Sequence, residues 1–419
     1  MIELGLSRIA RLVQHSQLPW RAIHIAGTNG KGSITGYLSA LLTAAGVRCG
    51  SFTSPHLIDR WDCITINERV IQESVFRRIE DEVKLRNKTL GIDATEFELL
   101  TATAFEIFSH EKVEIGIVEV GMGGRLDATN ILSNVLVSII AKIGYDHQAI
   151  LGDTIEKIAR EKAGIMKAGV PCVIDETNES RVREVLEAVA KDSQTPVNFI
   201  RPDTAKQALP DLAGVFQRLN AEPHQQANIS CAITALQKAL PQIRPNLSLT
   251  SLFQYISKTP RPGRLHELSL EPLIPRKDPV LLDGAHNAQS AGVLCSYVDR
   301  NLRKPGESVT WVVSASQGKD LPELFGCMIK PGDNVAVVEF GEVAGMPWVR
   351  SVETTNILSV VRAMPNFSRC EGFGRDIISG LKWANEISAG GPLVIAGSLY
   401  LVSDILRLLR ESKPEVLQT

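Results

Sequence analysis

A glycine-rich stretch near the N-terminus, HIAGTNGKGSITGYL at 24–38, places the tightest limit on how this chain can fold. The apolar run 22–26, which overlaps its start, predicts a strand. After the glycines, apolar residues recur with the i, i+3, i+4, i+7 spacing of an amphipathic helix, and these are Ile34, Tyr37, Leu38, Leu41, Leu42 and Ala45. Gly46 stands where glycine commonly ends a helix. A strand, a glycine loop and a helix in this order are typical of a phosphate-binding site.

The loop differs from the usual pattern G-x-x-x-x-G-K-[ST] by an additional glycine, Gly32, between Lys31 and Ser33. Backbone amides at a glycine turn and a helix N-terminus bind anions. We therefore expect the loop to hold phosphates, with Lys31 reaching the β- and γ-phosphates and Ser33 offering its hydroxyl to Mg²⁺. The loop residues are Gly27, Thr28, Asn29, Gly30, Lys31, Gly32 and Ser33. The alternative is an ordinary glycine-rich turn.

The first half of the chain continues the alternation of helices and strands. A helix is predicted at 95–112, where Thr95 and Glu98 have the spacing of a capping box. Apolar runs at 114–124 and 135–147 predict two strands. Such alternation indicates an α/β protein with a mostly parallel sheet, whose ligands bind at the carboxyl ends of the strands.

A proline- and glycine-rich segment at 257–267 predicts a linker, and a second alternating set follows it. Its predicted strands are 279–282, 311–316, 335–340 and 392–398, with a closing helix. We therefore expect a P-loop, parallel-sheet ATPase domain at 1–265 and a smaller, Rossmann-like α/β domain at 266–419. The pattern at 175–220 predicts no particular structure.

Composition excludes several classes of function. The net charge is −2, which gives no bulk electrostatic attraction to nucleic acid or to an anionic membrane. No apolar run reaches the roughly 18 residues of a membrane span. The seven cysteines are scattered and lack C-x-x-C spacing, which indicates a reducing compartment. The N-terminal segment contains Glu3 and no serine-rich tract, so we expect no transit peptide and a cytoplasmic location. The protein is also expected to be a monomer.

Three candidate metal ligands, Glu119, Asp146 and His147, lie at predicted strand ends. Glu119 lies inside an apolar strand, where a carboxylate is costly unless it binds a cation or forms an ion pair. The alternative for Glu119 is a buried pair with Arg125. His147 is by itself more typical of a surface or hydrogen-bonded histidine, and its candidacy depends on its neighbours.

Lys162 lies on the apolar stripe of a predicted helix, in TIEKIAREKAGIM, together with Ile155, Ile158, Ala159 and Met166. A buried lysine must be neutralised, paired or chemically modified. Taken alone, the pattern favours the other interpretation, in which the amine extends along the stripe to water.

The second domain opens with DGAHN, at 283–287, directly after a predicted strand. Asp283 and His286 in a strand-to-helix turn suit contacts to a nucleotide or substrate. The alternative is that the aspartate or the asparagine only caps the following helix.

Taken together, these motifs resemble the folylpolyglutamate synthase/dihydrofolate synthase family of the Mur-ligase superfamily. The resemblance covers almost the whole chain. Its motifs are HIAGTNGKGS, SPHL (54–57), EVGMGGRLDATN (119–130), DHxxxLG (146–152), EKAGI (161–165), HQxxN (224–228), PGR (262–264), DGAHN and GSLY (397–400). The additional glycine in the loop is a feature of this family.

Within the family the chain is most similar to the fungal monofunctional dihydrofolate synthases, on its compact length, its GLSRI start, GGRLDATN and EVAGMPWV (342–349). One departure is that Trp61-Asp62-Cys63 stands where the family has asparagine-glutamate-arginine. This departure weakens any transfer of substrate contacts in that loop and points to a narrower substrate range.

The resemblance implies roles for particular residues. Catalysis is implied for Lys31, His147, Lys162 and Arg264. Two Mg²⁺ ions would be held by Ser33, Glu119, His147 and Lys162, the last as a carbamate. ATP would be bound by the loop and by Asn228, Arg264, Asp283 and His286. Ser398 and the DGAHN histidine are implied, less directly, at the glutamate site.

The activity implied is ATP-dependent joining of L-glutamate to dihydropteroate through an acyl phosphate, with the two domains closing about the linker. The nearest alternatives are glutamate addition to tetrahydrofolate and an enzyme that does both. A nucleotide-dependent switch protein is a rival of another class. Such proteins usually carry N-K-x-D for guanine, whereas Asn87-Lys88 is followed here by Thr89-Leu90.

Overall fold

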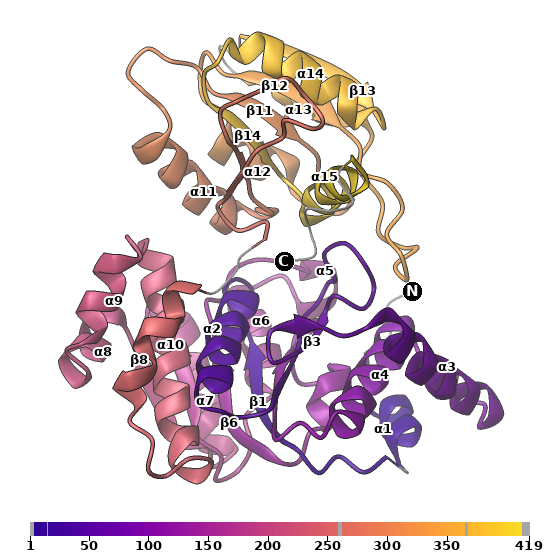
Figure 1. Cartoon of the computed structure of the whole chain (residues 1–419), viewed down its shortest axis with the longest axis vertical. Coiled ribbons are helices and arrows are strands. Elements are labelled where there is room, and N and C mark those ends of the chain that lie inside the picture. Colours follow the sequence, from indigo (N-terminus) through magenta and orange to yellow (C-terminus); the bar gives the residue numbers. More distant parts are fainter. Residues whose placement is uncertain (1–3, 15, 259–261, 365–367, 413–419) are drawn as a thin grey trace. The chain divides into compact units, whose positions relative to one another are not determined.

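The computed structural model describes residues 4–14, 16–258, 262–364 and 368–412 (Figure 1). Its chain separates into two compact units. Unit 1 comprises Met1–His56 and Trp61–Pro260, and unit 2 comprises Leu57–Arg60 and Arg261–Thr419. Part of the predicted linker, at 259–261, lies outside the described residues.

Unit 1 is built on an eight-stranded sheet of order β4-β3-β2-β5-β1-β6-β7-β8. The pairs β4–β3 and β3–β2 are antiparallel and the others are parallel. The strands are β1 Arg21–Ala26, β2 Cys49–Phe52, β3 Ile64–Ile66, β4 Arg69–Val70, β5 Ile115–Glu119, β6 Val135–Ile140, β7 Cys172–Asp175 and β8 Val197–Ile200.

Helices cover both faces of this sheet, which is why its central strands are almost continuously apolar. They are α1 Ser7–Val13, α2 Lys31–Ala44, α3 Glu73–Thr89, α4 Glu96–His110, α5 Gln148–Leu151, α6 Ile155–Ala163, α7 Ser180–Asp192, α8 Pro202–Ala208, α9 Leu212–Arg218 and α10 Pro223–Ala239, with 3₁₀ helices η1 Ala128–Ile131, η2 Leu240–Gln242 and η3 Leu249–Lys258. One core joins α2, α9 and α10 to the sheet. A second core joins α1, α3 and α4 to it, and a third joins α6 and α7.

Unit 2 contains a six-stranded sheet of order β13-β12-β11-β14-β10-β9, parallel except for the pair β10–β9. Its strands are β9 His266–Leu268, β10 Val280–Leu282, β11 Thr310–Val313, β12 Asn334–Val338, β13 Arg369–Gly374 and β14 Leu393–Ala396. Its helices are α11 Ala288–Asn301, α12 Leu321–Met328, α13 Thr354–Arg362, α14 Ile377–Ser388 and α15 Leu399–Ser412. One core lies under α11, α12 and α13, and another under α14 and α15.

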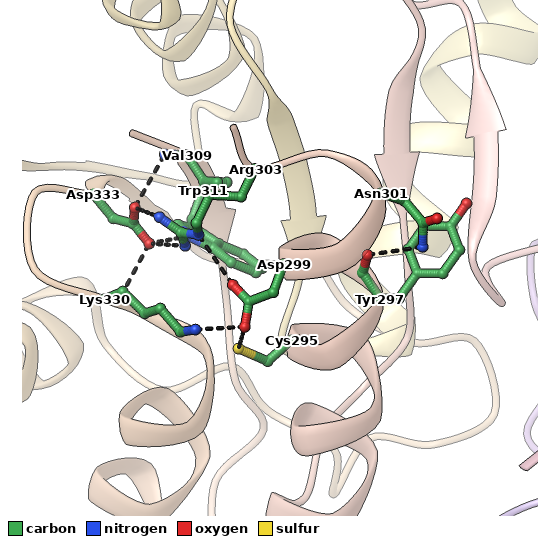
Figure 2. A network of polar contacts seen from close by, with 9 residues as sticks. All are labelled: Cys295, Tyr297, Asp299, Asn301, Arg303, Val309, Trp311, Lys330 and Asp333. Atoms are coloured by element: carbon green, nitrogen blue, oxygen red, sulfur yellow. Dashed lines mark hydrogen bonds and ion pairs between the residues drawn. The ribbon is translucent and has the colours of Figure 1, made fainter. Parts of the chain in front are cut away.

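A buried carboxylate organises one end of unit 2 (Figure 2). Asp333 is fully buried. It accepts two hydrogen bonds from the guanidinium of Arg303, at 2.6 and 2.8 Å, and one from the indole of Trp311 at 2.9 Å. The backbone amides of Val309 and Lys330 donate to it as well, each at 3.0 Å. Five donors compensate the cost of burying this charge.

Unit 2 also includes four residues from the first quarter of the chain. Leu57 and Ile58 pack against the core under α15. Asp59 accepts hydrogen bonds from the Arg410 guanidinium, one of them at 2.9 Å. The chain therefore leaves unit 1 immediately after the SPHL histidine, His56, and returns to it at Trp61.

The predicted fold class is confirmed. The structure also confirms the strand before the glycine loop, the helix after it and the capping box of Thr95 and Glu98. The strand predicted to reach His147 is shorter, because β6 ends at Ile140 and a loop follows. Most of 175–220, which the pattern left open, forms α7, β8, α8 and α9. Among the described residues, no helix is both long enough and apolar enough to cross a membrane.

Candidate functional site

The phosphate loop joins β1 to α2 and is attached to the neighbouring strand end. The backbone amides of Thr28 and Asn29 both donate to the carbonyl of Lys142, at 2.8 and 3.1 Å. The Thr28 hydroxyl donates to the carbonyl of Gly144 at 2.9 Å. These contacts fix the first half of the loop, and the amides of the first turn of α2, which starts at Lys31, form the anion-binding end.

Glycine is required at two positions of the loop. Gly30 has φ +91°, and a Cβ there would lie 2.3 Å from Oδ1 of Asn228. Gly27 has φ +154°, and a Cβ would lie 2.8 Å from the Cβ of Ala141. Asn228 itself is buried on α10. The structure therefore brings Asn228, which the resemblance implied in ATP binding, against the phosphate loop.

Lys31 and Glu119 face each other at the start of α2. Their Nζ and Oε1 atoms are 3.6 Å apart. The Lys31 amine also donates to the carbonyls of Gly27, at 3.1 Å, and Thr28, at 3.2 Å. Glu119 ends β5 and is buried. The alternative pairing of Glu119 with Arg125 is wrong, because Arg125 binds Glu161 instead, at 2.8 Å.

Lys162 is buried, so the interpretation in which its amine extends to water is wrong. It lies on the inner face of α6 with Ile155, Ile158 and Ala159, although α6 ends before Met166. Its Nζ donates to the carbonyl of Gly27 at 2.9 Å. Burial, and then the nearby charge of Lys31, lower the pKa of Lys162 to about 7.

Three carboxylates oppose this shift, namely Asp146, Asp127 and Glu119, and each raises the pKa of Lys162. Asp146 and His147 lie in the turn before α5, and the Asp146 carboxylate accepts from the His147 amide at 2.8 Å. The side chain of His147 is 42% exposed, and its Nε2 lies 3.9 Å from Oδ1 of Asp146. The site thus combines two cations with several carboxylates around one loop.

This donor set fits Mg²⁺. Magnesium usually takes one or two protein carboxylates and keeps water and phosphate oxygens as its other ligands. Glu119 lies beside the first turn of α2, where a Cβ on Gly32 would be 3.6 Å from its Oε2, and Ser33 is the next residue of that turn. The described residues contain no cluster of three or more histidine, cysteine, aspartate or glutamate side chains suited to a metal, so any ion here would rely on phosphate and water as well.

Asp127 lies in the GGRLDATN loop and is buried, and the sequence pattern did not single it out. It accepts from the amide of Met122 at 2.8 Å and from the hydroxyl of Thr129 at 2.6 Å. Thr129 in turn contacts Nε2 of His24 at 2.9 Å. Burial raises the pKa of Asp127 and lowers that of His24 to about 3. The sequence feature that could have indicated Asp127 is its place as an aspartate within a glycine-rich motif.

A second group of predicted residues lies together in unit 2. Asp283 follows β10 and accepts from the amides of Leu265 at 2.7 Å and Ala285 at 2.8 Å. A Cβ on Gly284 would lie 3.0 Å from Nη1 of Arg264. Burial raises the pKa of Asp283, and the Arg264 charge opposes this rise. Asp283 therefore holds the Arg264 turn rather than capping a helix.

His286 and Asn287 complete this turn. Nδ1 of His286 lies 2.8 Å from the carbonyl of Gly284. The side chain of Asn287 accepts from the amide of Ser290 at 2.9 Å and caps α11, so the capping alternative holds for this residue. Ser398 is buried at the start of α15, where its hydroxyl accepts from the amide of Tyr400 at 3.1 Å.

Comparisons with known proteins agree with this arrangement. A family model described as "Dihydrofolate synthetase, C-terminal domain" matches residues 266–408. The chain is 35% identical to a probable dihydrofolate synthetase of Schizosaccharomyces pombe, over 98% of this chain and 99% of that protein. It is also 35% identical to dihydrofolate synthetase of Saccharomyces cerevisiae, over 97% and 98%. A solved structure of a bifunctional folylpolyglutamate synthase/dihydrofolate synthase from Yersinia pestis, complexed with AMPPNP and Mn ion, is 25% identical with a TM-score of 0.78, covering 98% of this chain and 94% of that chain.

Proposed function

Because the chain belongs to the folylpolyglutamate synthase/dihydrofolate synthase family, we propose that it is an ATP-dependent ligase that joins L-glutamate to 7,8-dihydropteroate and forms dihydrofolate. This reaction belongs to folate biosynthesis. The observation that carries the proposal is the match, across nearly the whole chain, to two fungal dihydrofolate synthetases. The phosphate loop with Lys31, Glu119 and Lys162 around it supplies the chemistry.

The reaction needs activation of a carboxylate, whose oxygen is a poor leaving group. Transfer of the γ-phosphoryl group of ATP to the pteroate carboxylate forms an acyl phosphate and releases ADP. The α-amine of glutamate then attacks the carbonyl carbon, loses a proton and expels phosphate, which leaves an amide. Lys31 and the first-turn amides of α2 would bind the phosphate oxygens and stabilise the charge that develops during transfer.

The expected metal is Mg²⁺, in two ions, held by Ser33, Glu119, His147 and Lys162. When bound, it would neutralise charge on the transferred phosphoryl group. Lys162 suits a carbamate, because an amine must be neutral to attack carbon dioxide. A lysine whose pKa is about 7 is neutral in roughly half of the molecules at pH 7, against fewer than about 1 in 1,000 for an ordinary lysine.

The remaining assignments follow the resemblance. We propose that ATP is bound by Asn228, Arg264, Asp283 and His286, with Arg264 also acting in catalysis. Domain boundaries at 1–265 and 266–419 are proposed for the ATP-binding and the glutamate-ligase domains. We also propose that the protein is a monomer. A cytoplasmic location is proposed because all seven cysteines are free thiols, which fits a reducing compartment.

The test is product analysis by mass spectrometry. Purified protein, MgATP and glutamate are incubated with dihydropteroate in one reaction and with tetrahydrofolate in another. Dihydrofolate in the first reaction alone supports the proposal. Lys31→Ala serves as the inactive control, because its loss removes the phosphate-binding amine.

The second candidate is the bifunctional activity, which the Yersinia pestis structure carries in its name. Dihydrofolate in the first reaction together with added glutamates in the tetrahydrofolate reaction would establish it. Added glutamates in the tetrahydrofolate reaction alone would indicate a folylpolyglutamate synthase. No ligated product in either reaction would refute the ligase proposal altogether.

A further inference from the structure

We propose that the GGRLDATN loop positions Lys162 by holding the last turn of α6, with Arg125, Asn130 and Gly164 as the positioning residues. The inference rests on the proposed function only in taking Lys162 to act at the phosphates. It assigns a role to two motifs that the site above does not otherwise use, GGR and the glycine of EKAGI.

The first observation is a set of hydrogen bonds to the end of α6. The backbone amide of Arg125 donates to the carbonyl of Glu161 at 2.8 Å. Nδ2 of Asn130 donates to the carbonyl of Gly164 at 2.9 Å and to that of Arg125 at 3.1 Å. The last carbonyls of a helix have no partner within the helix. The loop adds a donor to the carbonyl of Glu161, which also accepts from the amide of Gly164 at 3.3 Å, and supplies one to the carbonyl of Gly164 just after the helix. These two carbonyls lie on either side of Lys162 in the chain.

The second observation is close packing that only glycine permits. A Cβ on Gly164 would lie 2.3 Å from the Cβ and 2.5 Å from the Cα of Arg125. A Cβ on Gly124 would lie 2.7 Å from the carbonyl oxygen of Lys162 and 2.9 Å from that of Glu161. Both glycines therefore let two backbones touch, and neither backbone can yield in the way that a flexible side chain would.

The third observation is an ion pair across the same junction. The Arg125 guanidinium donates to Oε1 of Glu161 twice, at 3.1 and 2.8 Å. Its side chain is 54% exposed and faces a hollow of about 490 Å³. An exposed pair contributes little to stability. With two hydrogen bonds to one carboxylate oxygen, the Arg125–Glu161 pair is instead suited to orienting the last turn of α6.

The side chain of Lys162 connects the last turn of α6 to the phosphate loop. Lys162 lies in the turn that the loop holds, and its Nζ donates to the carbonyl of Gly27. A shift of the turn displaces that amine by a comparable distance. Displacement of a catalytic group by about 1 Å lowers a rate on the order of 100-fold.

The decisive variant is Gly164→Ala. Gly164 has φ −63°, which alanine adopts without strain, so the substitution tests the contact with Arg125 alone. The matched control is Gly326→Ala in α12, because a Cβ at Gly326 has nothing within 4 Å. Asn130→Ala is a second variant, which removes a donor and adds no bulk.

Two quantities are measured for each variant. The first is the split between kcat and KM for dihydrofolate formation. The second needs no substrate and is the rate at which an amine-reactive reagent labels Lys162, read by peptide mass spectrometry relative to the exposed Lys157. We expect Gly164→Ala to lower kcat about 10- to 100-fold with KM for glutamate within about threefold. Labelling of Lys162 should rise at least about fivefold, and Gly326→Ala should change neither quantity.

Two results would overturn the inference. One is kcat and Lys162 labelling within twofold of the control in both Gly164→Ala and Asn130→Ala. The other is lost activity with a lowered melting temperature and equally faster labelling of all lysines, which would indicate general destabilisation. If the wild-type chain forms no dihydrofolate, the labelling comparison still decides whether the loop holds Lys162.

Discussion

Replacing Lys162 by methionine should stabilise the folded protein, and the gain should shrink as the pH rises. The folded-state pKa of Lys162 is lowered from 10.5 to about 7, mainly by burial. Between these values the unfolded chain keeps a proton that the folded chain has released. The cost of burying this amine is therefore full below about pH 7 and disappears above the unfolded pKa.

The magnitude follows from the two pKa values. The fall of the pKa from 10.5 to about 7 corresponds to a cost of about 4 kcal/mol at pH 7 and roughly 2 kcal/mol at pH 9. Methionine removes the charge and keeps a side chain of similar length. It also removes the 2.9 Å hydrogen bond to the carbonyl of Gly27, which costs about 1 kcal/mol at either pH. The expected net gain is about 3 kcal/mol at pH 7 and about 1 kcal/mol at pH 9.

The assay is urea unfolding at both pH values, without nucleotide and in buffer free of carbon dioxide, with hydrogen exchange of α6 as the readout for unit 1. Lys157→Met on the same helix is the control, because its side chain is 62% exposed, and we expect less than about 0.5 kcal/mol at either pH. A gain that is equal at pH 7 and pH 9, or a loss at both, would refute the reasoning. The stabilised variant should also be inactive, because its role at the phosphates is lost.

Three further substitutions test separate parts of the structure. Gly30→Ala should raise KM for ATP by at least about tenfold in steady-state kinetics, because φ is +91° and the methyl would meet Asn228 at 2.3 Å; an unchanged KM would contradict this geometry. Asp333→Ala should lower stability by about 3–5 kcal/mol in a melting experiment, because the partly buried Arg303 guanidinium and three further donors lose the buried carboxylate that accepts from them; a loss under about 1 kcal/mol would show that water replaces it. Thr95→Ala should cost about 1 kcal/mol in urea unfolding, since it removes one half of a capping box, and should leave kcat unchanged.

Local features of this chain were predictable because their causes lie within a few residues. The helix after the glycine loop follows from apolar spacing, and the start of α4 follows from Thr95 and Glu98. The cap at the start of α11 was offered by the sequence only as an alternative, by the aspartate or the asparagine of DGAHN, and the structure assigns it to Asn287. In each case the hydrogen bond or the apolar face involves residues one to four positions apart, so the pattern and the structure have the same cause.

Contacts between distant segments were predictable only in part. Family motifs named Glu119 and Lys162, but spacing alone favoured the wrong environment for the lysine and left open the wrong partner for Arg125. Asp127 and the role of 175–220 were missed, because a short polar loop and mixed amphipathic segments carry no period that says what they contact.

What the sequence by itself determined is therefore the fold class, the strand and helix on either side of the phosphate loop, and the family of the chain. What only the tertiary structure decided is which of the distant groups meet. Lys162 meets Gly27 across 135 positions of the chain, Asn228 packs on Gly30, and Leu57 joins unit 2. The physical reason is that local hydrogen bonding and apolar spacing act between near neighbours. The burial of a residue and the charges around it, in contrast, depend on which distant segments the fold packs against that residue.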